Sequence, residues 1–273
     1  MRFESPERRL QDIGVLVTRP APQAVALCRM LEAEGARAIS FPTVTIGPAP
    51  DLVTLRDKLR AIEPIGLAIF VSPNAVEHGA ALVRKLAIQP RIAAIGPSTA
   101  GALEAAGLRV NVRPALGYTS EDLLAEPALE RIAGLRVAIL RGGEGRELLA
   151  AELTSRGADV HAFDVYARRL PYVNEHDAAK LTARWRHREI DIIIATSVET
   201  LANLHKLLGR DATDFILRTP VVTSSERVGR AALRLGHRLP CLIAAGPDAR
   251  SLVAALIDWR TRNAEKSDDR RKD

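Results

Sequence analysis

Short apolar runs alternate along the chain with longer stretches in which apolar residues recur every three or four positions. The short runs predict buried strands at residues 14–18, 36–41, 67–72, 91–96, 136–141, 158–164, 191–197, 220–224 and 241–246. The stretches between them predict amphipathic helices at residues 23–34, 73–85, 99–106, 145–156, 198–208, 226–235 and 247–259. Because alternating strands and helices are typical of parallel sheets covered on both faces, we expect an α/β fold.

Three consecutive units of this pattern occur twice, in the same order. The segment that begins at Gly14 aligns without a gap with the segment that begins at Arg136, at an offset of 122 residues, so that Arg19 corresponds to Arg141. Next, LAIFVSPNAVEHGAALV resembles DIIIATSVETLANLHKLL, and RIAAIGPSTAGALEAAGL resembles PVVTSSERVGRAALRLGH. Such a repeat indicates that the chain holds two copies of one α/β domain.

Each copy of the first unit ends in an extended stretch, ARAISFPTVTIGP in one half and ADVHAFDVYARRLP in the other. Both stretches alternate in polarity, run into a proline and are longer than a core strand needs. They fit a pair of linkers that cross between domains. In that arrangement the first unit, up to about Phe41, belongs to the same domain as the part of the chain after Pro171. Two sequential domains that divide near Gly134 are the simpler alternative, and the residues leave both arrangements open.

Composition narrows the class of protein. A chain of 273 residues with 47% hydrophobic and 26% charged residues is typical of a globular protein with about two domains. The net charge is +6, but Lys and Arg form no dense stripe and aromatic residues are only 4%, so we expect no nucleic-acid partner. No apolar run approaches the roughly 20 residues that span a bilayer. The charged N-terminus also lacks the apolar region of a signal peptide, so we expect no membrane partner and a cytoplasmic protein.

Two further features of the composition bear on chemistry and order. Cys28 and Cys241 stand apart and belong to no CxxC motif, which fits a reducing compartment and predicts no metal site. The chain after about Arg262 is polar and highly charged, so we expect it to be a disordered tail.

Short segments rich in Ser, Thr, Gly and Pro follow most of the predicted strands. They are Thr18-Arg19-Pro20, Ser72-Pro73-Asn74, Gly96-Pro97-Ser98-Thr99, Arg141-Gly142-Gly143, Thr196-Ser197, Ser224-Ser225-Glu226 and Gly246-Pro247-Asp248. Ser, Thr and Asp at such positions are ordinary helix N-caps, which accounts for most of them singly. Ligands bind beyond the carboxyl ends of strands in open α/β sheets, and helix N-termini attract anions. The whole set therefore also fits a wide cleft between facing domains that holds a ligand with many carboxylates.

The sequence contains no familiar catalytic motif. RGGEGR at 141–146 is not GxGxxG, and neither a Walker motif nor a GxSxG elbow occurs. The six histidines are scattered without metal spacing and are expected at the surface, and Glu144, Glu147 and Asp164 form no obvious acid–base pair. These absences favour either a binding protein or an enzyme whose substrate is already reactive and needs mainly positioning.

A series of segments carries a family resemblance. They are VTRPAPQAVALCRMLEAEGA, FVSPNAV, AIGPSTAGAL, YTSEDLL, LRGGEGRELLAAELTSRGADV, VYARRLP and IATSVETLANL, in this order between about Gly14 and Trp259. Together they resemble the uroporphyrinogen-III synthase family. The resemblance implies two similar three-layer domains with parallel sheets, joined by a two-stranded β-ladder linker that the chain crosses twice. We therefore expect domain 1 at residues 13–41 plus 171–262, domain 2 at 45–165, linkers at 42–44 and 166–170, and tails at 1–12 and 263–273.

The resemblance also implies an activity. Hydroxymethylbilane, a linear tetrapyrrole with many carboxylates, would lose water, invert its last pyrrole ring through a spiro intermediate and close to uroporphyrinogen III, on a monomeric enzyme without metal or organic cofactor. The resemblance assigns help with the departing hydroxyl to Tyr166. The expected substrate-binding residues are Thr18, Arg19, Ser72, Ser98, Thr99, Arg141, Gly142, Thr196, Ser197, Ser224 and Ser225.

Several alternatives stay open at this stage. Either serine of the Ser224–Ser225 pair aligns with the family position, and Thr196-Ser197-Val198 lacks the Pro or Gly often found in the comparable loop. Arg19 and Arg141 fit a strand-end cap or an interdomain ion pair as well as a carboxylate ligand. For the whole chain, a non-enzymatic tetrapyrrole-binding module of the same fold is the main alternative. A phosphate-binding isomerase and an RNA-associated protein are the others.

Overall fold

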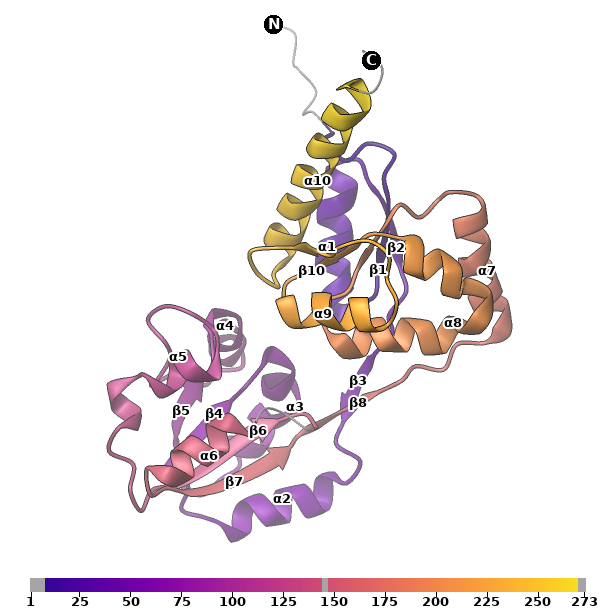
Figure 1. Ribbon diagram of the computed structural model, residues 1–273. Helices are drawn as coiled ribbons and strands as arrows, with labels where there is room; N and C mark the ends of the chain where they lie inside the picture. Colours follow the sequence, from indigo (N-terminus) through magenta and orange to yellow (C-terminus); the bar gives the residue numbers. More distant parts are fainter. Residues whose placement is uncertain (1–7, 144–146, 270–273) are drawn as a thin grey trace, which may run out of the picture. The chain divides into compact units, whose positions relative to one another are not determined.

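A computed structural model describes residues 8–143 and 147–269, with side chains up to Asn263. The chain forms two compact units, one from Met1–Thr45 with Leu170–Asp273 and the other from Ile46–Arg169. Each unit holds its own parallel sheet with helices on both faces (Figure 1). The predicted α/β class with parallel sheets is therefore confirmed.

The sheet of the first unit has the order β11-β10-β9-β1-β2, and each strand pairs with its neighbour in parallel. Its strands are β1 (Gly14–Val17), β2 (Arg37–Ser40), β9 (Ile192–Ile194), β10 (Val221–Thr223) and β11 (Leu242–Ile243). Successive side chains of a strand point to opposite faces. Val15 and Val17 accordingly join the core shared with α1 (Ala21–Ala33) and α10 (Ala249–Asp269). Leu16 joins the core of the opposite face, which is covered by α7 (Glu175–Arg186), α8 (Val198–Arg218) and α9 (Glu226–Arg234).

The sheet of the second unit has the order β5-β4-β6-β7 and is parallel throughout. Its strands are β4 (Leu67–Phe70), β5 (Arg91–Ala94), β6 (Arg136–Arg141) and β7 (Asp159–Asp164). One face packs on α2 (Leu52–Ala61), α3 (Pro73–Val83) and α4 (Pro97–Ala105). The other packs on α5 (Ser120–Leu124), the 3-10 turn η1 (Pro127–Leu129) and α6 (Leu148–Ser155).

Strands that correspond in the sequence repeat take corresponding places in the two sheets. The order β5-β4-β6-β7 matches β10-β9-β1-β2, since β1 aligns with β6 and β9 with β4. The first unit adds β11 beside β10, whereas in the second unit a parallel bridge joins Ala93 of β5 to Val112 at the same place. The internal repeat is therefore a repeat of topology as well as of sequence.

A separate two-stranded sheet is formed by β3 (Thr45–Pro48) and β8 (Tyr166–Arg169) (Figure 1). Both strands lie within the two extended stretches that the sequence predicted. Directly beside them, the backbone N–H of Ala49 donates to the carbonyl of Val165 at 3.3 Å.

The ends of the chain differ from expectation. Leu10, predicted to lie in a tail, is fully buried in the core of the first unit, and its N–H donates to the carbonyl of Glu34 at 2.8 Å. At the other end, α10 continues to Asp269, past the Arg262 at which we expected disorder to begin. A run of charged residues does not stop a helix that is already nucleated by a buried face. Residues 1–7 and 270–273, the rest of the predicted tails, lie outside the described residues.

The sequence prediction missed α2, α5 and α7 and shortened α8 and α10; α5 has only five residues. α2 and α7 were not predicted, because few of their side chains are buried: Leu59 in α2, and Leu181, Thr182 and Trp185 in α7. α8 continues to Arg218 beyond a break at Gly209, whose φ of 63° and ψ of −155° are not helical.

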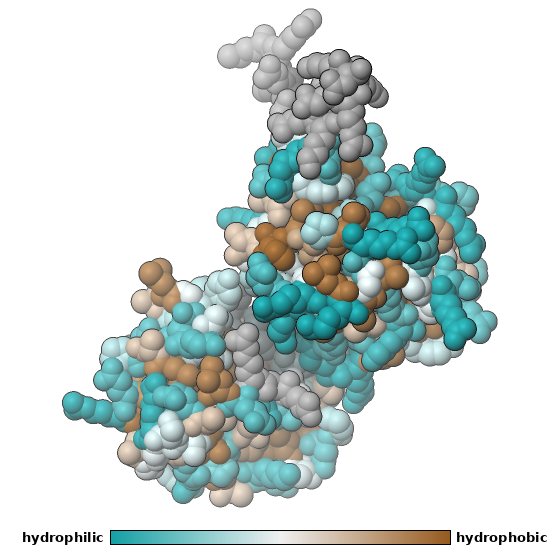
Figure 2. All heavy atoms as spheres, viewed as in Figure 1, coloured by the Kyte–Doolittle hydropathy of each residue, from teal (hydrophilic) through white to brown (hydrophobic). Residues whose placement is uncertain are grey.

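The surface of the first unit is strongly polar over α9. Arg227, Arg230 and Arg234 belong to this helix, and hydrophilic side chains gather over it in Figure 2. Among the described helices, none combines the length and the apolar character that a membrane span requires.

Candidate functional site

Most of the predicted site residues lie at the carboxyl ends of the parallel strands in their own unit. In the second unit these are Ser72 after β4, Thr99 and Ser98 in the first turn of α4 after β5, and Arg141 and Gly142 at the end of β6. Tyr166 begins β8 just beyond the end of β7. Because neighbouring strand ends share one edge of a sheet, the sequence placed these residues correctly along a single edge.

Gly142 and His78 both lie against the side chain of Tyr166. Its side chain is almost fully buried, at 6% exposure, and its ring packs directly on Gly142. A Cβ at Gly142 would lie 2.5 Å from Cδ2 of that ring and closer still to Cε2 and Cζ, so only glycine fits here. The imidazole of His78 lies on the ring as well, with centroids 6.0 Å apart.

The Tyr166 hydroxyl lies 3.4 Å from the hydroxyl of Ser72. Ser72 is the N-cap of α3, and its Oγ accepts the N–H of Ala75 at 3.1 Å. An N-cap hydroxyl that accepts from the backbone still has its own O–H to donate. Ser72 thus places the phenol at the start of α3, where the backbone N–H groups carry partial positive charge.

Arg141 ends β6 beside Asp164, which ends β7. The Arg141 Nε donates to Asp164 Oδ1 at 3.0 Å, and the arginine side chain is 24% exposed. This ion pair joins two adjacent strand ends within the second unit, which is the strand-end role that the sequence left open for Arg141.

Thr99 and Ser98 differ in access although they are neighbours. Thr99 is 2% exposed, whereas Ser98 is open to solvent. Gly96, the N-cap of α4, contributes no side chain to cap the helix. Of the two hydroxyls, that of Ser98 is therefore the more accessible to a ligand.

In the first unit, Thr18 and Arg19 follow β1. Thr18 is fully buried, and its hydroxyl donates to the carbonyl of Ile194 at 2.8 Å, so this side chain ties β1 to β9 and is not open to a ligand. Arg19 donates from Nη1 to the carbonyl of Pro247 at 3.1 Å and from Nη2 to Gln23 Oε1 at 3.3 Å. Burial lowers the pKa of Arg19, and nearby Asp248 acts in the opposite direction. Arg19 thus ties the loop after β1 to the segment that leads into α10.

The serines of the first unit are helix caps. Ser197 forms a capping box at the start of α8, where its Oγ accepts the N–H of Thr200 at 3.1 Å. Ser225 is the N-cap of α9 and accepts the N–H of Arg227 at 3.3 Å. Thr196 and Ser224 precede these caps and are half-buried. The ordinary N-cap role that the sequence offered for such residues therefore applies to Ser72, Ser197 and Ser225.

The expected surface placement of the histidines was wrong in part. His237 is 5% exposed, and its Nε2 lies 3.2 Å from Nε2 of His205. Burial and the nearby His205 lower the pKa of His237 to about 4. His78, half-buried against Tyr166, was missed as a contact of the site, and its place on the helix that Ser72 caps was the available signal. Glu144, one of the three acidic residues for which the sequence indicated no obvious acid–base pair, lies outside the described residues, as does the rest of 144–146.

Comparison with known proteins identifies this arrangement. A family model described as uroporphyrinogen-III synthase HemD matches residues 25–254. The chain belongs to the uroporphyrinogen-III synthase family. The uroporphyrinogen-III synthase of Salmonella typhimurium is 35% identical over 250 residues, covering 89% of this chain and 100% of that relative. That of Escherichia coli is 33% identical over 249 residues, with the same coverage.

Solved structures agree on the fold of the uroporphyrinogen-III synthase family. A mutant synthase from the extremely thermophilic bacterium Thermus thermophilus is 20% identical, covers 93% of this chain and 99% of its own, and has a TM-score of 0.60. The synthetase of Helicobacter pylori is 15% identical, with coverages of 90% and 99% and a TM-score of 0.60. The family resemblance expected from the motifs is confirmed, and the chain is an enzyme, a lyase of porphyrin and heme biosynthesis, and not a non-enzymatic binding module.

Proposed function

We propose that this chain closes hydroxymethylbilane to uroporphyrinogen III, with loss of water and inversion of the last pyrrole ring through a spiro intermediate. The structural observation that carries the proposal is the packing of the Tyr166 side chain. Its ring lies on a glycine that no other residue can replace without displacing it, and its hydroxyl meets Ser72. A firmly positioned phenol in a site without a familiar acid–base motif suits a reaction that needs the delivery of one proton and otherwise needs only the correct positioning of the substrate.

In this mechanism Tyr166 donates its proton to the departing hydroxyl of the bilane, which leaves as water. The methylene cation left on the first pyrrole ring is attacked by the substituted α-carbon of the last ring, which gives the spiro intermediate. The bond from that α-carbon to the methylene bridge of the third ring then breaks and leaves a cation on this bridge. The free α-carbon of the last ring attacks that cation and closes the macrocycle with the last ring inverted. A pyrrole that regains its aromaticity on ring closure releases a proton, which restores the phenol. Ser72, through its O–H, orients the phenol or a substrate oxygen.

The carboxylates of the substrate are bound, in this proposal, by hydroxyl and amide donors at the strand ends of both units. Ser72, Ser98, Ser197 and Ser225 supply hydroxyls, and the first turns of α3, α4, α8 and α9 supply backbone N–H groups. Thr18 and Arg19 act behind this layer by fixing the end of β1 and the start of α10.

The two compact units are the repeated domains, so that the first domain is discontinuous and the β3–β8 pair is the linker. The enzyme works as a cytoplasmic monomer, without a nucleic-acid partner and without metal or organic cofactor. Full turnover after exhaustive dialysis against EDTA would support the absence of a metal requirement, and loss of turnover that Mg²⁺ or Zn²⁺ restores would overturn it.

One assay tests the reaction. Freshly made hydroxymethylbilane is incubated with the protein, the products are oxidised to porphyrins, and the isomers are resolved by chromatography. We expect the inverted isomer to dominate at a rate proportional to protein concentration. Accumulation of only the uninverted isomer at the rate of the protein-free control would refute the proposal.

Tyr166→Phe tests the residue within that reaction. The variant keeps the ring that packs on Gly142 and removes only the hydroxyl, so its fold should be unchanged by circular dichroism and Tm. Loss of general acid catalysis predicts a fall in kcat of about 10²-fold or more, with little change in KM. Unchanged turnover would remove the hydroxyl from the mechanism while leaving the reaction itself in place.

A further inference from the structure

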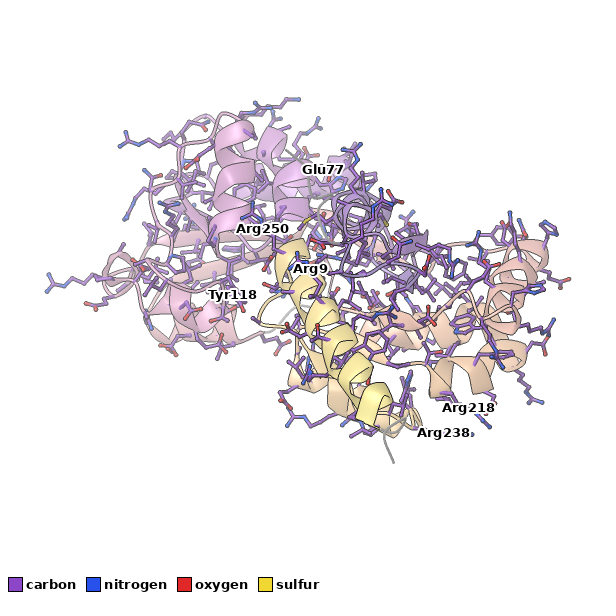
Figure 3. The ribbon with its side chains drawn as sticks, turned by 90° about the horizontal axis from the view of Figure 1, so that it is seen from above. Arg9, Glu77, Tyr118, Arg218, Arg238 and Arg250 are labelled. Atoms are coloured by element: carbon purple, nitrogen blue, oxygen red, sulfur yellow. The ribbon has the colours of Figure 1, made fainter. Side chains whose placement is uncertain are left out.

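An exposed tyrosine is held in an unusually well-defined position on the loop between Val112 and α5. Tyr118 is 55% exposed and is labelled in Figure 3 at the surface of the second unit. Its backbone N–H donates to Oδ2 of Asp122 at 3.0 Å. The N–H and the hydroxyl of Thr119 donate to the same oxygen, at 2.9 and 2.7 Å. These hydrogen bonds, led by that from Thr119, lower the pKa of the Asp122 carboxyl and keep it ionised as an acceptor.

Two glycines adapt the surroundings to this loop. Gly117 adopts a φ of +95°, and a Cβ there would lie 2.8 Å from Oδ1 of Asp122 and closer to its Oδ2. Gly96, the N-cap of α4, lets the backbone of the loop approach: a Cβ at Gly96 would lie 2.8 Å from Cβ and 3.2 Å from Cα of Tyr118. A capping box and two glycines thus position a residue whose side chain is left in water.

The place of this loop links it to the proposed site. Gly96 follows β5, which pairs with β4, and Ser72 follows β4 on the same edge of the sheet. Ser98, the accessible hydroxyl of the α4 N-terminus, is two residues from the glycine that Tyr118 touches. The carboxyl ends of β5, β4, β6 and β7 form a strand-end row in this order. Tyr118 therefore borders the β5 end of the row, and Tyr166, just beyond β7, lies at its other end.

We propose that Tyr118 is a substrate-contacting residue, whose exposed ring packs against a pyrrole ring of the linear tetrapyrrole at the β5 end of this row. The inference rests on the proposed function. An aromatic ring on an anchored loop gives contact area with little loss of side-chain freedom, and pyrroles offer the flat face that such a ring prefers. The contact acts on binding and not on the departing hydroxyl, which is assigned to Tyr166.

Steady-state kinetics with hydroxymethylbilane test the proposal on the full-length protein. Tyr118→Ala should raise KM about three- to tenfold, the range expected for loss of one aromatic contact, with kcat within about twofold of the unaltered enzyme. Tyr118→Phe keeps the ring and should retain a KM within about twofold of the same reference. Tyr172→Ala is the matched control, since Tyr172 is 92% exposed and lies outside the strand-end row.

The outcomes separate this inference from the function on which it rests. If the unaltered enzyme makes no inverted isomer above the protein-free rate, the proposed function fails before Tyr118 is tested. If that enzyme is active, the inference is overturned by a Tyr118→Ala variant with unchanged KM, by an equal rise in KM for Tyr172→Ala, or by a Tyr118→Phe variant as impaired as Tyr118→Ala. Equal Tm values for the variants and the unaltered protein exclude loss of folding as the cause.

Discussion

Replacing Gly142 with alanine should displace the ring of Tyr166. The added Cβ would lie 2.5 Å from Cδ2 of the ring and closer to two other ring carbons, whereas carbon atoms pack at about 3.5–4.0 Å. The ring must therefore move by at least about 1 Å. Its hydroxyl, already 3.4 Å from that of Ser72, would leave hydrogen-bonding distance. A displacement of this size at a reacting group lowers kcat by about 100-fold, and overpacking costs about 1–3 kcal/mol of stability.

The assay is the formation of the inverted isomer, with Tm measured in parallel. Gly101→Ala is the matched control: Gly101 lies in α4 with no heavy atom near its would-be Cβ, so alanine should leave kcat unchanged and stabilise the helix by about 0.5–1 kcal/mol. The effects of Gly142→Ala and Tyr166→Phe on kcat should also be coupled. In a Tyr166→Phe background the hydroxyl is already gone, so Gly142→Ala should lower kcat much less than it does alone. Equal effects in both backgrounds, or full activity of Gly142→Ala, would refute the positioning argument.

Further predictions concern stability. Because the pKa of His237 is held at about 4, below its ordinary 6.5, its contribution to the free energy of unfolding is complete above pH 6.5 and is lost as pH falls toward 4. The loss of free energy of unfolding is at most about 3 kcal/mol. When urea titrations at about pH 7 and about pH 4.5 are compared, the difference in free energy of unfolding between the two pH values should be smaller for His237→Gln than for the unaltered protein. An identical difference in both proteins would argue against the His205–His237 pair as its source. Leu10→Ala should cost about 2–5 kcal/mol in urea unfolding because Leu10 is fully buried, whereas a tail residue would cost nothing measurable. Thr219→Val removes the acceptor of the buried Trp185 Nε1–H, 3.0 Å away. The variant should therefore lower the free energy of unfolding by about 1–3 kcal/mol and change the tryptophan fluorescence. Neither change is expected if water replaces the Thr219 hydroxyl.

The pattern of apolar residues predicted the sheets well because their strands are fully buried. β1, β4, β9 and β10 are short apolar runs with no exposed side chain, and each was placed to within a few residues. The internal repeat then implied which strands correspond, and the two sheets share the same order. Repetition supplied long-range information that periodicity alone does not contain.

Elements with little buried surface escaped prediction. α7 has charged residues along most of its length, and α2 buries only Leu59. The boundary errors at Leu10 and in α10 have a similar origin. Leu10 is one apolar residue within a charged segment, so only the tertiary structure shows that it is buried.

The strand-end rule located the candidate site but did not separate its members. Thr18 and Ser98 looked alike in sequence, yet one is sealed inside the sheet and the other is open to solvent. The reason that Gly142 must be glycine is the ring of Tyr166, which lies far along the chain beyond another helix and another strand. Contacts of this kind depend on side-chain packing between strands, which no local pattern encodes.

The division of the chain between the two units has a consequence for synthesis on the ribosome. The second unit is one continuous segment and can fold as soon as Arg169 has emerged. The first unit cannot, because β1 is made before the second unit and its partner strand β9 only after it; the two strands pair Val15 with Ile192. Until β9 is made, β1 and β2 are an apolar fragment with an unpaired strand edge, which is prone to association with other chains. We expect a translation pause, or the binding of a chaperone, after Arg169 has been synthesised to affect the yield of native enzyme more than the same event before Arg169 has been synthesised.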